Sequence, residues 1–398
     1  MRDIPPVTAL FAARACRDFG DGFVAVLLPV YLLALGFDPF QVGVVATASL
    51  FGSALLTLAI GMVGGRHDNR RLLLAAAGLM VATGVAFAAV HDYALLVLVA
   101  FAGTINPSGG STSIFVPLEH AVLTGTVSSA DRTKMFARYS LAGALAGAAG
   151  SLVAAAPDFL EPFGIGQLAA IKLMFVFYAL LGFAGAAFYA ALPARGAEAA
   201  AAPASALGPS RGIVLRLAAL FSLDSFAGGF AVQSLLALWL FERFDMSLSA
   251  AGLFFFWSGV LAAFSFPVAA WLSRHVGLVN TMVFTHIPAN LALIGAAFAP
   301  DLATALGLLL LRAALSQMDV PARSSYVMAV VTPPERAAAA SFTAVPRSLA
   351  SAASPALAGA LFAASPLAWP LIACGALKIV YDLLLLQQFR HVKPPEEK

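Results

Sequence analysis

The chain has 398 residues, of which 61% are hydrophobic and 11% are charged. Soluble domains average roughly 45–50% apolar and about 25% charged residues, so this composition excludes a soluble protein. The net charge of +3 does not indicate a nucleic-acid partner, because the basic residues gather in short connections between apolar segments. Cys16 and Cys374 lie in different apolar segments, so neither a disulfide framework nor a metal site is expected.

Twelve apolar segments follow one another along the chain, and each is long enough to cross a bilayer as a helix. No segment alternates apolar and polar residues, as a membrane-spanning strand would. The fourth and tenth segments are unusually long. The predicted segments are residues 9–35, 41–64, 71–90, 94–126, 132–156, 166–192, 213–241, 249–273, 278–299, 302–331, 336–363 and 367–389.

The Lys and Arg residues at the ends of these segments and between them gather at alternate connections. Basic residues precede segment one and occupy every second connection after it, whereas the intervening connections carry only Arg243. Cytoplasmic loops retain Lys and Arg, so the pattern predicts that both termini lie in the cytoplasm and that the protein resides in the cytoplasmic membrane. The basic residues of these connections are Arg2, Arg66, Arg70, Arg71, Arg132, Lys134, Arg195, Arg211, Arg216, Arg274, Arg336, Arg390, Lys393 and Lys398.

A linker divides the chain into two halves of six segments. Residues 193–212 are rich in Ala, Pro and Ser and have no apolar period, which is typical of a linker. The predicted domains are residues 1–192 and 213–398, and the linker is predicted to be cytoplasmic. The halves resemble each other at four places in the same order, which indicates a duplicated six-helix unit. Gly22-Phe23 matches Gly229-Phe230, Arg66-His67 matches Arg274-His275, Pro117-Leu118-Glu119 matches Pro321-Ala322-Arg323, and Asp131-Arg132 matches Glu335-Arg336.

The connection between segments two and three carries a motif rich in Gly and Arg. It resembles the gating loop of the major facilitator superfamily, in which Gly61, Arg66 and Arg70 fit the family pattern and Arg71 extends its basic end. Gly65 stands where the family has an Asp, so we expect the gate latch to be altered or moved to Asp68. The resemblance implies an all-α membrane protein of two pseudo-symmetric six-helix bundles. It also implies that segments one, four, seven and ten line a central cavity.

Segment ten carries the clearest polar stripe. On a continuous helix its polar residues lie within about 80° of one another. They are Arg312, Ser316, Asp319, Arg323 and Tyr326. A polar stripe on an apolar helix faces water or partners, so we predict that these side chains line a substrate pathway. The alternative is an internal ion pair between Asp319 and Arg323, which are four residues apart.

Segment one carries a second set of charges on one helical face. These are Arg14, Arg17, Asp18 and Asp21. Ionisable residues inside a bilayer cost about 2.5–3.5 kcal/mol on insertion scales, so each needs a partner or a function. Asp18 and Asp21 are the first candidates for proton carriers, and Arg17 for the cavity wall. The alternative is two neutralised pairs, Arg14 with Asp18 and Arg17 with Asp21.

Segments four and seven hold the other candidates for the cavity. Pro107 and the following glycines predict a kink that could expose Ser108 and Ser111 to substrate. Glu119 is either a proton carrier or the partner of Arg138 in segment five. In segment seven, Asp224 is a candidate carrier. Gln233 is a candidate for the cavity wall, but it lies on the opposite helical face.

Small residues in segment five and Arg347 in segment eleven have structural interpretations. Gly143, Gly147 and Ser151 are spaced four apart, which favours close helix packing. Arg347 is expected to serve as a charge partner. No phosphate-binding loop, nucleophile elbow or zinc-protease motif occurs in the sequence, so we expect neither an enzyme nor a cofactor or metal.

The sequence therefore predicts a secondary active transporter that works by alternating access. The expected reaction is proton-coupled efflux of a small organic molecule through a monomer embedded in lipid, with Asp18, Asp21, Glu119, Asp224 and Asp319 as candidate carriers. One alternative is a symporter or exchanger for organic anions, because Arg suits carboxylate and phosphate. An alternative of another class is a non-transporting sensor or scaffold with the same fold.

Overall fold

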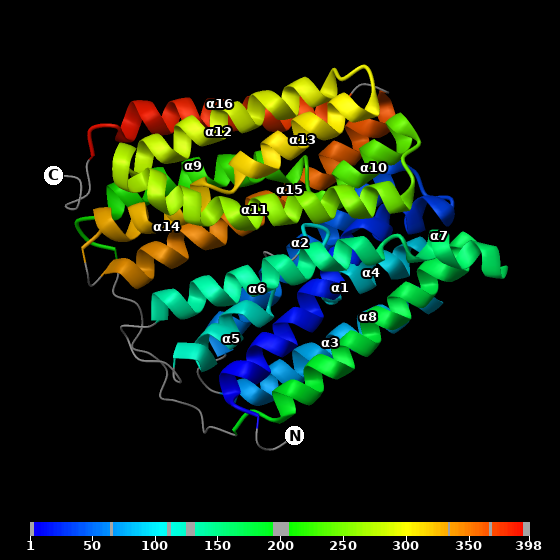
Figure 1. The fold of residues 1–398 in the computed structure, drawn as a ribbon. Helices are drawn as coiled ribbons and strands as arrows, with labels where there is room; N and C mark the ends of the chain where they lie inside the picture. The colour runs from blue at the N-terminus through cyan, green and yellow to red at the C-terminus, as the bar shows by residue number, and fades with distance from the viewer. Residues whose placement is uncertain are drawn as a thin grey trace. The chain divides into compact units, whose positions relative to one another are not determined.

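The computed structural model describes residues 4–63, 67–109, 113–124, 132–193, 207–332, 335–365 and 368–392. Within these residues every regular element is a helix, which confirms the all-α prediction (Figure 1). In the N-terminal half the helices are α1 (Pro6–Ala34), α2 (Pro39–Val63), α3 (Asn69–Ala89), α4 (Tyr93–Ala102), α5 (Phe115–Thr124), α6 (Arg132–Val153), α7 (Ala156–Leu160), the short 3-10 helix η2 (Glu161–Phe163) and α8 (Gln167–Ala190).

The C-terminal half is also entirely helical within the described residues. Its helices are α9 (Arg211–Gly229), α10 (Gln233–Phe244), α11 (Leu248–Val276), α12 (Leu278–Ala297), α13 (Leu302–Ser316), α14 (Asp319–Val330), α15 (Arg336–Ala364) and α16 (Trp369–Phe389). Each predicted segment coincides with one helix or with two consecutive helices.

Nine stretches within the described residues are long and apolar enough to cross a membrane. The count of twelve crossings stays a prediction. Of the remaining predicted segments, α1 is long enough but carries four charged side chains, and the fourth segment is divided into α4 and α5.

Three predicted segments are broken rather than continuous. The fourth breaks between Ala102 and Phe115, the seventh between Gly229 and Gln233, and the tenth between Ser316 and Asp319. The fourth and the tenth are the two unusually long segments, so their length indicates two helices in one crossing. The predicted stripe of segment ten is wrong as a single helical face, because Arg312 and Ser316 belong to α13 whereas Asp319, Arg323 and Tyr326 belong to α14.

Two compact units make up the chain. The first unit comprises Met1–Ala201 and Gln233–Phe256, and the second comprises Ala202–Val232 and Trp257–Lys398. The N-terminal helices therefore pack with α10 and the first turns of α11.

In the first unit, α1 lies alongside α6 and α8 (Figure 1). Glycines let α1 and α6 approach closely: a Cβ on Gly22 would lie 2.1 Å from the Gly147 carbonyl oxygen. The Ser151 hydroxyl donates to the Gly22 carbonyl oxygen at 3.3 Å. The predicted packing role of the small residues in segment five is confirmed.

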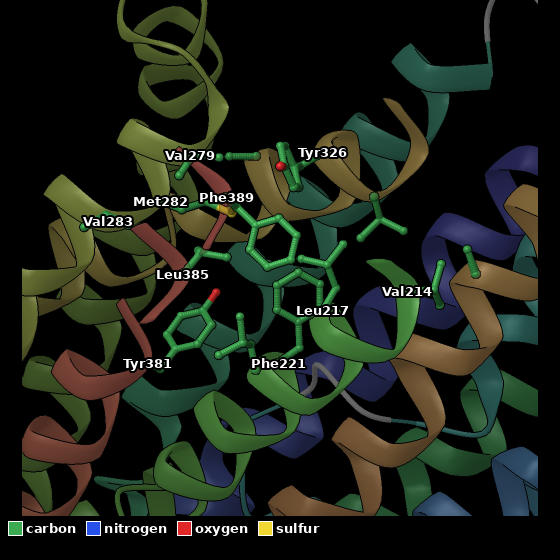
Figure 2. Close-up of a cluster of buried hydrophobic side chains, with 14 of the residues drawn as sticks. Val214, Leu217, Phe221, Val279, Met282, Val283, Tyr326, Tyr381, Leu385 and Phe389 are labelled. Carbon is green, nitrogen blue, oxygen red and sulfur yellow. The ribbon is translucent and has the colours of Figure 1, made fainter. Parts of the chain in front are cut away.

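In the second unit, α9 lies alongside α15 (Figure 1). Gly229 takes the place of Gly22 here, because a Cβ on it would lie 2.5 Å from the Ser351 carbonyl oxygen. Next to this contact, α9, α12, α14 and α16 enclose an apolar cluster (Figure 2). Tyr326 lies in that cluster against Phe389, and its hydroxyl donates to the Val392 carbonyl oxygen at 3.0 Å. The candidate pathway residue Tyr326 is thus surrounded by apolar side chains.

Candidate functional site

The first unit contains a buried group of five charged residues, which we call the N-terminal charge cluster: Arg14, Arg17, Asp18, Asp21 and Glu119. Arg17 of α1 pairs with Glu119 of α5, with Nη1 and Oε2 2.9 Å apart. Asp18 lies between two guanidinium groups, 2.9 Å from Arg14 Nε and 3.2 Å from Arg17 Nε. The predicted pair of Arg14 with Asp18 is confirmed.

Glu119 is the most enclosed carboxylate of this cluster, with no exposed surface. It accepts hydrogen bonds from the hydroxyl of Tyr189, at 2.6 Å, and from the hydroxyl of Tyr139. The alternative prediction that Glu119 pairs with Arg138 is wrong. Arg138 is exposed on α6, and Arg17 is the cation beside Glu119. The helical period predicts which side chains share one face of a helix, but not which neighbouring helix that face contacts.

Asp21 has no ion pair within the described residues. The predicted pair of Arg17 with Asp21 is wrong, because the Arg17 side chain is directed at Glu119 and Asp18. Asp21 is 1% exposed, and its Oδ1 accepts a hydrogen bond of 3.3 Å from the Tyr178 hydroxyl. Tyr178 is also within 3.2 Å of the Thr104 hydroxyl. The N-terminal charge cluster therefore holds three carboxylates and two guanidinium groups, and Asp21 is the acid left over.

The second unit contains a corresponding group, which we call the C-terminal charge cluster: Asp224, His286, Asp319, Arg323, Lys378 and Asp382. Asp224 of α9 is its centre, because Lys378 Nζ lies 2.5 Å from Oδ1 and Arg323 Nη1 lies 2.9 Å from Oδ2. Arg323 also pairs with Asp319 at 3.4 Å, which confirms the predicted pair four residues apart. His286 and Asp382 complete the cluster, with Nδ1 and Oδ1 3.0 Å apart.

Three members of the C-terminal charge cluster were missed by the sequence analysis. His286 lies on α12, and Lys378 and Asp382 lie on α16, which are outside the segments that the resemblance places around the cavity. The available signal was the pair Lys378 and Asp382, spaced four apart inside an apolar segment. Any charge within such a segment is costly and calls for a partner.

The two clusters carry the same ion pair with reversed charge. The sequence match that aligns Gly22 with Gly229 also aligns Arg17 with Asp224, and a second match aligns Glu119 with Arg323. Each pair joins its two helices at 2.9 Å, so a cation on α1 corresponds to an anion on α9. The positions that the sequence matches align therefore hold ion pairs of opposite polarity in the two units.

The structure brings Ser108 and Gln233 to one place in the first unit. Ser108 lies in the turn after α4, where its backbone N–H donates to Asn106 Oδ1 at 2.9 Å. A Cβ on the adjacent Gly109 would lie 2.2 Å from Gln233 Oε1, and the Ser234 N–H donates to the Pro107 carbonyl oxygen at 3.0 Å. This turn therefore rests on the start of α10. Ser111 lies outside the described residues.

The remaining arginine candidates differ in their partners. Arg312 of α13 forms no ion pair within the described residues, and its buried Nε has no hydrogen-bond partner there. Ser316 lies one turn further along the same helix and is half-buried. Arg347 of α15 is half-buried and close enough to Arg323, Asp224 and Asp319 to interact electrostatically with them. Arg347 thus lies near the C-terminal charge cluster, and its role as a charge partner stays a prediction.

The gating-loop residues lie at helix ends. Asp68 caps α3 by accepting a hydrogen bond of 3.0 Å from the Arg70 N–H. Arg70 Nη2 donates to the Ala190 carbonyl oxygen at 2.7 Å, at the C-terminal end of α8, where a cation is favoured. Gly61 is exposed on α2, Arg71 is exposed on α3, and Arg66 lies outside the described residues.

Comparisons with known proteins agree with this architecture. The family model of the Major Facilitator Superfamily matches residues 10–318. The uncharacterized membrane protein YJR124C of Saccharomyces cerevisiae is 22% identical over 419 residues, covering 96% of this chain and 94% of that protein.

Solved transporter structures share the fold. A bacterial homolog of the human lysosomal transporter Spinster, in an inward-facing and occupied conformation, has a TM-score of 0.75 at 16% identity, covering 96% of both chains. The nucleoside transporter NupG has a TM-score of 0.74 at 14% identity, covering 98% of this chain and 100% of that one. A bacterial homologue of the iron transporter ferroportin, in an inward-facing state, has a TM-score of 0.69 at 15% identity, covering 96% and 98%.

Proposed function

The chain belongs to the Major Facilitator Superfamily and is a membrane transporter, and we propose that it couples the movement of a small organic molecule to protons, with Asp21 as a carrier. The proposed mechanism is alternating access, as in transporters built from repeats. We propose that both termini lie in the cytoplasm, because Lys and Arg gather at alternate connections and cytoplasmic loops retain such residues.

The excess carboxylate of the N-terminal charge cluster carries the proposal. Asp21 is 1% exposed and its bonding partner is a tyrosine hydroxyl rather than a cation. Burying a carboxylate without a cation costs free energy, and a bound proton removes that cost. Asp18 and Glu119 differ in this respect, because each is in contact with a guanidinium group. A proton on Asp21 would leave the cluster with two cations and two anions.

Asp224 and Asp319 rank below Asp21 as carriers. Asp224 is in contact with both Lys378 and Arg323, and Asp319 is in contact with Arg323. A carboxylate that is already compensated gains less from a proton than one that is not. We therefore assign these two residues to fixing the helices of the second unit, and Asp18 and Glu119 to the same task in the first.

The substrate is proposed to be a small organic compound that is exported. The solved relatives include a nucleoside transporter, so nucleosides belong in the first panel of probes, together with amphipathic amines and organic acids. Transporters of metals share the fold as well. Within the described residues no group of three or more His, Cys, Asp and Glu side chains is placed to hold a metal ion, which favours organic probes.

An organic anion is the second candidate substrate, and Arg312 favours it. Its guanidinium lies within an apolar helix and has no carboxylate partner in the described part of the chain. Guanidinium forms two parallel hydrogen bonds with carboxylate or phosphate. Arg312→Gln should then weaken binding of organic acids about tenfold or more while leaving amines unaffected. Arg323 is less available, because Asp224 and Asp319 already occupy it.

Proton movement triggered by substrate tests the proposal. Purified protein is reconstituted into liposomes that contain the pH indicator pyranine, and each probe is added without an imposed gradient. A transported probe should change the internal pH in wild-type vesicles and not in Asp21→Asn vesicles. Asp301→Asn is the matched control, because Asp301 is an exposed N-cap residue whose bond Asn can replace. Probe flux without any pH change would refute coupling, and the absence of flux for every probe would favour a sensor or scaffold.

A further inference from the structure

His286 of α12 lies between two carboxylates of the second unit. Its Nδ1 is 3.0 and 3.1 Å from the two carboxylate oxygens of Asp382, and its Nε2 is 3.9 Å from Asp224 Oδ1. The side chains of His286 and Asp382 are 3% and 0% exposed. One imidazole nitrogen is therefore hydrogen-bonded, while the other faces a carboxylate at a distance too long for a hydrogen bond.

The other charges around this pair are already matched with one another. Lys378 and Arg323 contact Asp224, and Asp319 contacts Arg323, so these four groups are balanced. Asp382 has no ion-pair partner other than His286 among the described residues. From α16, the Tyr381 ring meets His286 edge-on at 6.1 Å. Arg347 faces the cluster from α15 and is half-buried, so solvent screens it more than the others.

Two protonation states of the pair are compatible with this geometry. With one proton, on Nδ1, a neutral imidazole donates to the Asp382 carboxylate, and the Nε2 lone pair is directed toward Asp224. With a second proton, on Nε2, the imidazolium cation lies between two anions. Histidine is the side chain that changes charge most readily near neutral pH. The second proton compensates Asp382, which is otherwise the unmatched acid of the C-terminal charge cluster.

We propose that His286 and Asp382 form a second proton-binding site, in addition to Asp21, and that its occupancy acts on Asp224. A proton on Nε2 brings a third cation to Asp224, in competition with Lys378 and Arg323. That competition would weaken the contacts that join α9 to α14 and α16 in the second unit. The role in transport rests on the proposed proton coupling, whereas proton binding by the pair does not.

Histidine NMR on the full-length protein in detergent tests proton binding directly. The chain has six histidines, so labelling at 13Cε1 gives six signals. Each is assigned by a His→Gln substitution, and the other five assignments identify His286 if His286→Gln does not fold. If the pair binds a second proton, the position of the His286 signal should depend on pH, and Asp382→Asn should change that dependence. Asp301→Asn is the matched control and should leave the response of the His286 signal unchanged.

A His286 signal that does not respond to pH, or that responds identically in Asp382→Asn, would overturn the proposal. Pyranine vesicles then test the role in transport. Asp382→Asn should lower the number of protons moved per substrate while the substrate is still carried. If wild-type vesicles move no protons with any substrate, the proposed coupling fails, and the NMR titration still decides whether the pair binds a proton.

Discussion

At the scale of single residues, the pair of Arg17 and Glu119 is the clearest example of charge held inside the first unit. Both side chains are buried, at 3% and 0% exposure, so neither charge is solvated when its partner is lost. Removing one partner of a buried pair costs about 3–5 kcal/mol, because the other charge stays buried alone. The pair therefore joins α1 to α5 more firmly than an exposed ion pair could.

A double-mutant cycle on this pair is the first prediction. Arg17→Gln alone should lower the free energy of unfolding by about 3–5 kcal/mol. Adding Glu119→Gln should cost less than the sum of the two single changes, by about 1–3 kcal/mol, because no unpaired charge is left. Thermal unfolding in detergent measures all four proteins. Arg71→Gln, at an exposed position, should change stability by less than about 0.5 kcal/mol. Additive losses would contradict the pairing.

Contacts within one helix could be predicted from sequence, and contacts between helices could not. The pairs Arg14–Asp18 and Asp319–Arg323 are four residues apart, so helical geometry alone brings them together. The partner of Glu119 depends on how α5 meets α1, which no periodicity encodes. His286 and Asp382 were missed for the same reason, since their relation exists only after α12 and α16 pack.

At the scale of helices, close approach depends on glycine. A Cβ on Gly150 of α6 would lie 1.9 Å from the Phe19 carbonyl oxygen of α1, which is far below a normal contact. Gly150→Ala should therefore lower stability by about 1–3 kcal/mol, because one helix must move away. Gly78→Ala in α3 is the control, since nothing lies within 4 Å of its Cβ position. Equal melting temperatures for the two variants would contradict the packing of α1 against α6.

The start of α15 supplies a prediction about pH. Hydroxyl hydrogen bonds from Ser210 and Thr332, and backbone N–H groups near Gly208, lower the pKa of Glu335 from 4.5 to about 2. The folded state thus prefers the ionised carboxylate. The stability it contributes is fully present above pH about 4.5 and is lost as pH falls toward about 2. The difference in melting temperature between wild type and Glu335→Gln should be constant above pH 5 and shrink below it. A difference independent of pH down to 3 would contradict this assignment.

Helix breaks were partly predictable. Pro107 and the following glycines predicted the interruption of segment four, whereas the break in segment ten was not predicted, because its polar stripe was interpreted on one continuous helix. The break after Gly229 was not predicted either, although Gly228 and Gly229 precede it in the sequence. The helices on either side of this break, α9 and α10, belong to different compact units. The interruption therefore follows from tertiary contacts.

At the scale of the whole molecule, composition and loop charge sufficed for the fold class. They did not predict that residues 233–256 pack with the N-terminal helices. In the first unit, Asp158 of α7 accepts hydrogen bonds from the Ser249 N–H at 2.9 Å and from its hydroxyl at 2.7 Å. A Cβ on Gly252 would lie 2.7 Å from the Ser151 carbonyl oxygen. Such contacts depend on the conformation that the protein adopts, and a sequence pattern does not specify which conformation that is.

The prediction at this scale concerns the release of residues 233–256 from the N-terminal helices. In the proposed alternating-access cycle, residues 233–256 must leave the N-terminal helices, so Asp158→Ala should make that step easier. A cysteine at Ser234, which is fully buried, reports opening by its reaction with a polar maleimide once Cys16 and Cys374 are replaced by Ala. Labelling should be several-fold faster with Asp158→Ala and unchanged with Asp301→Ala. Equal rates in all three backgrounds would show that Asp158 does not hold the segment.

The central claim is that a proton on Asp21 is coupled to movement of the substrate. Once a substrate is known, the most direct measurement compares accumulation driven by a pH gradient with exchange of labelled substrate, in the same Asp21→Asn vesicles. Exchange needs no net proton movement, so the account predicts that it persists while driven accumulation falls to the level of empty liposomes. Accumulation at the wild-type rate in Asp21→Asn would contradict the account.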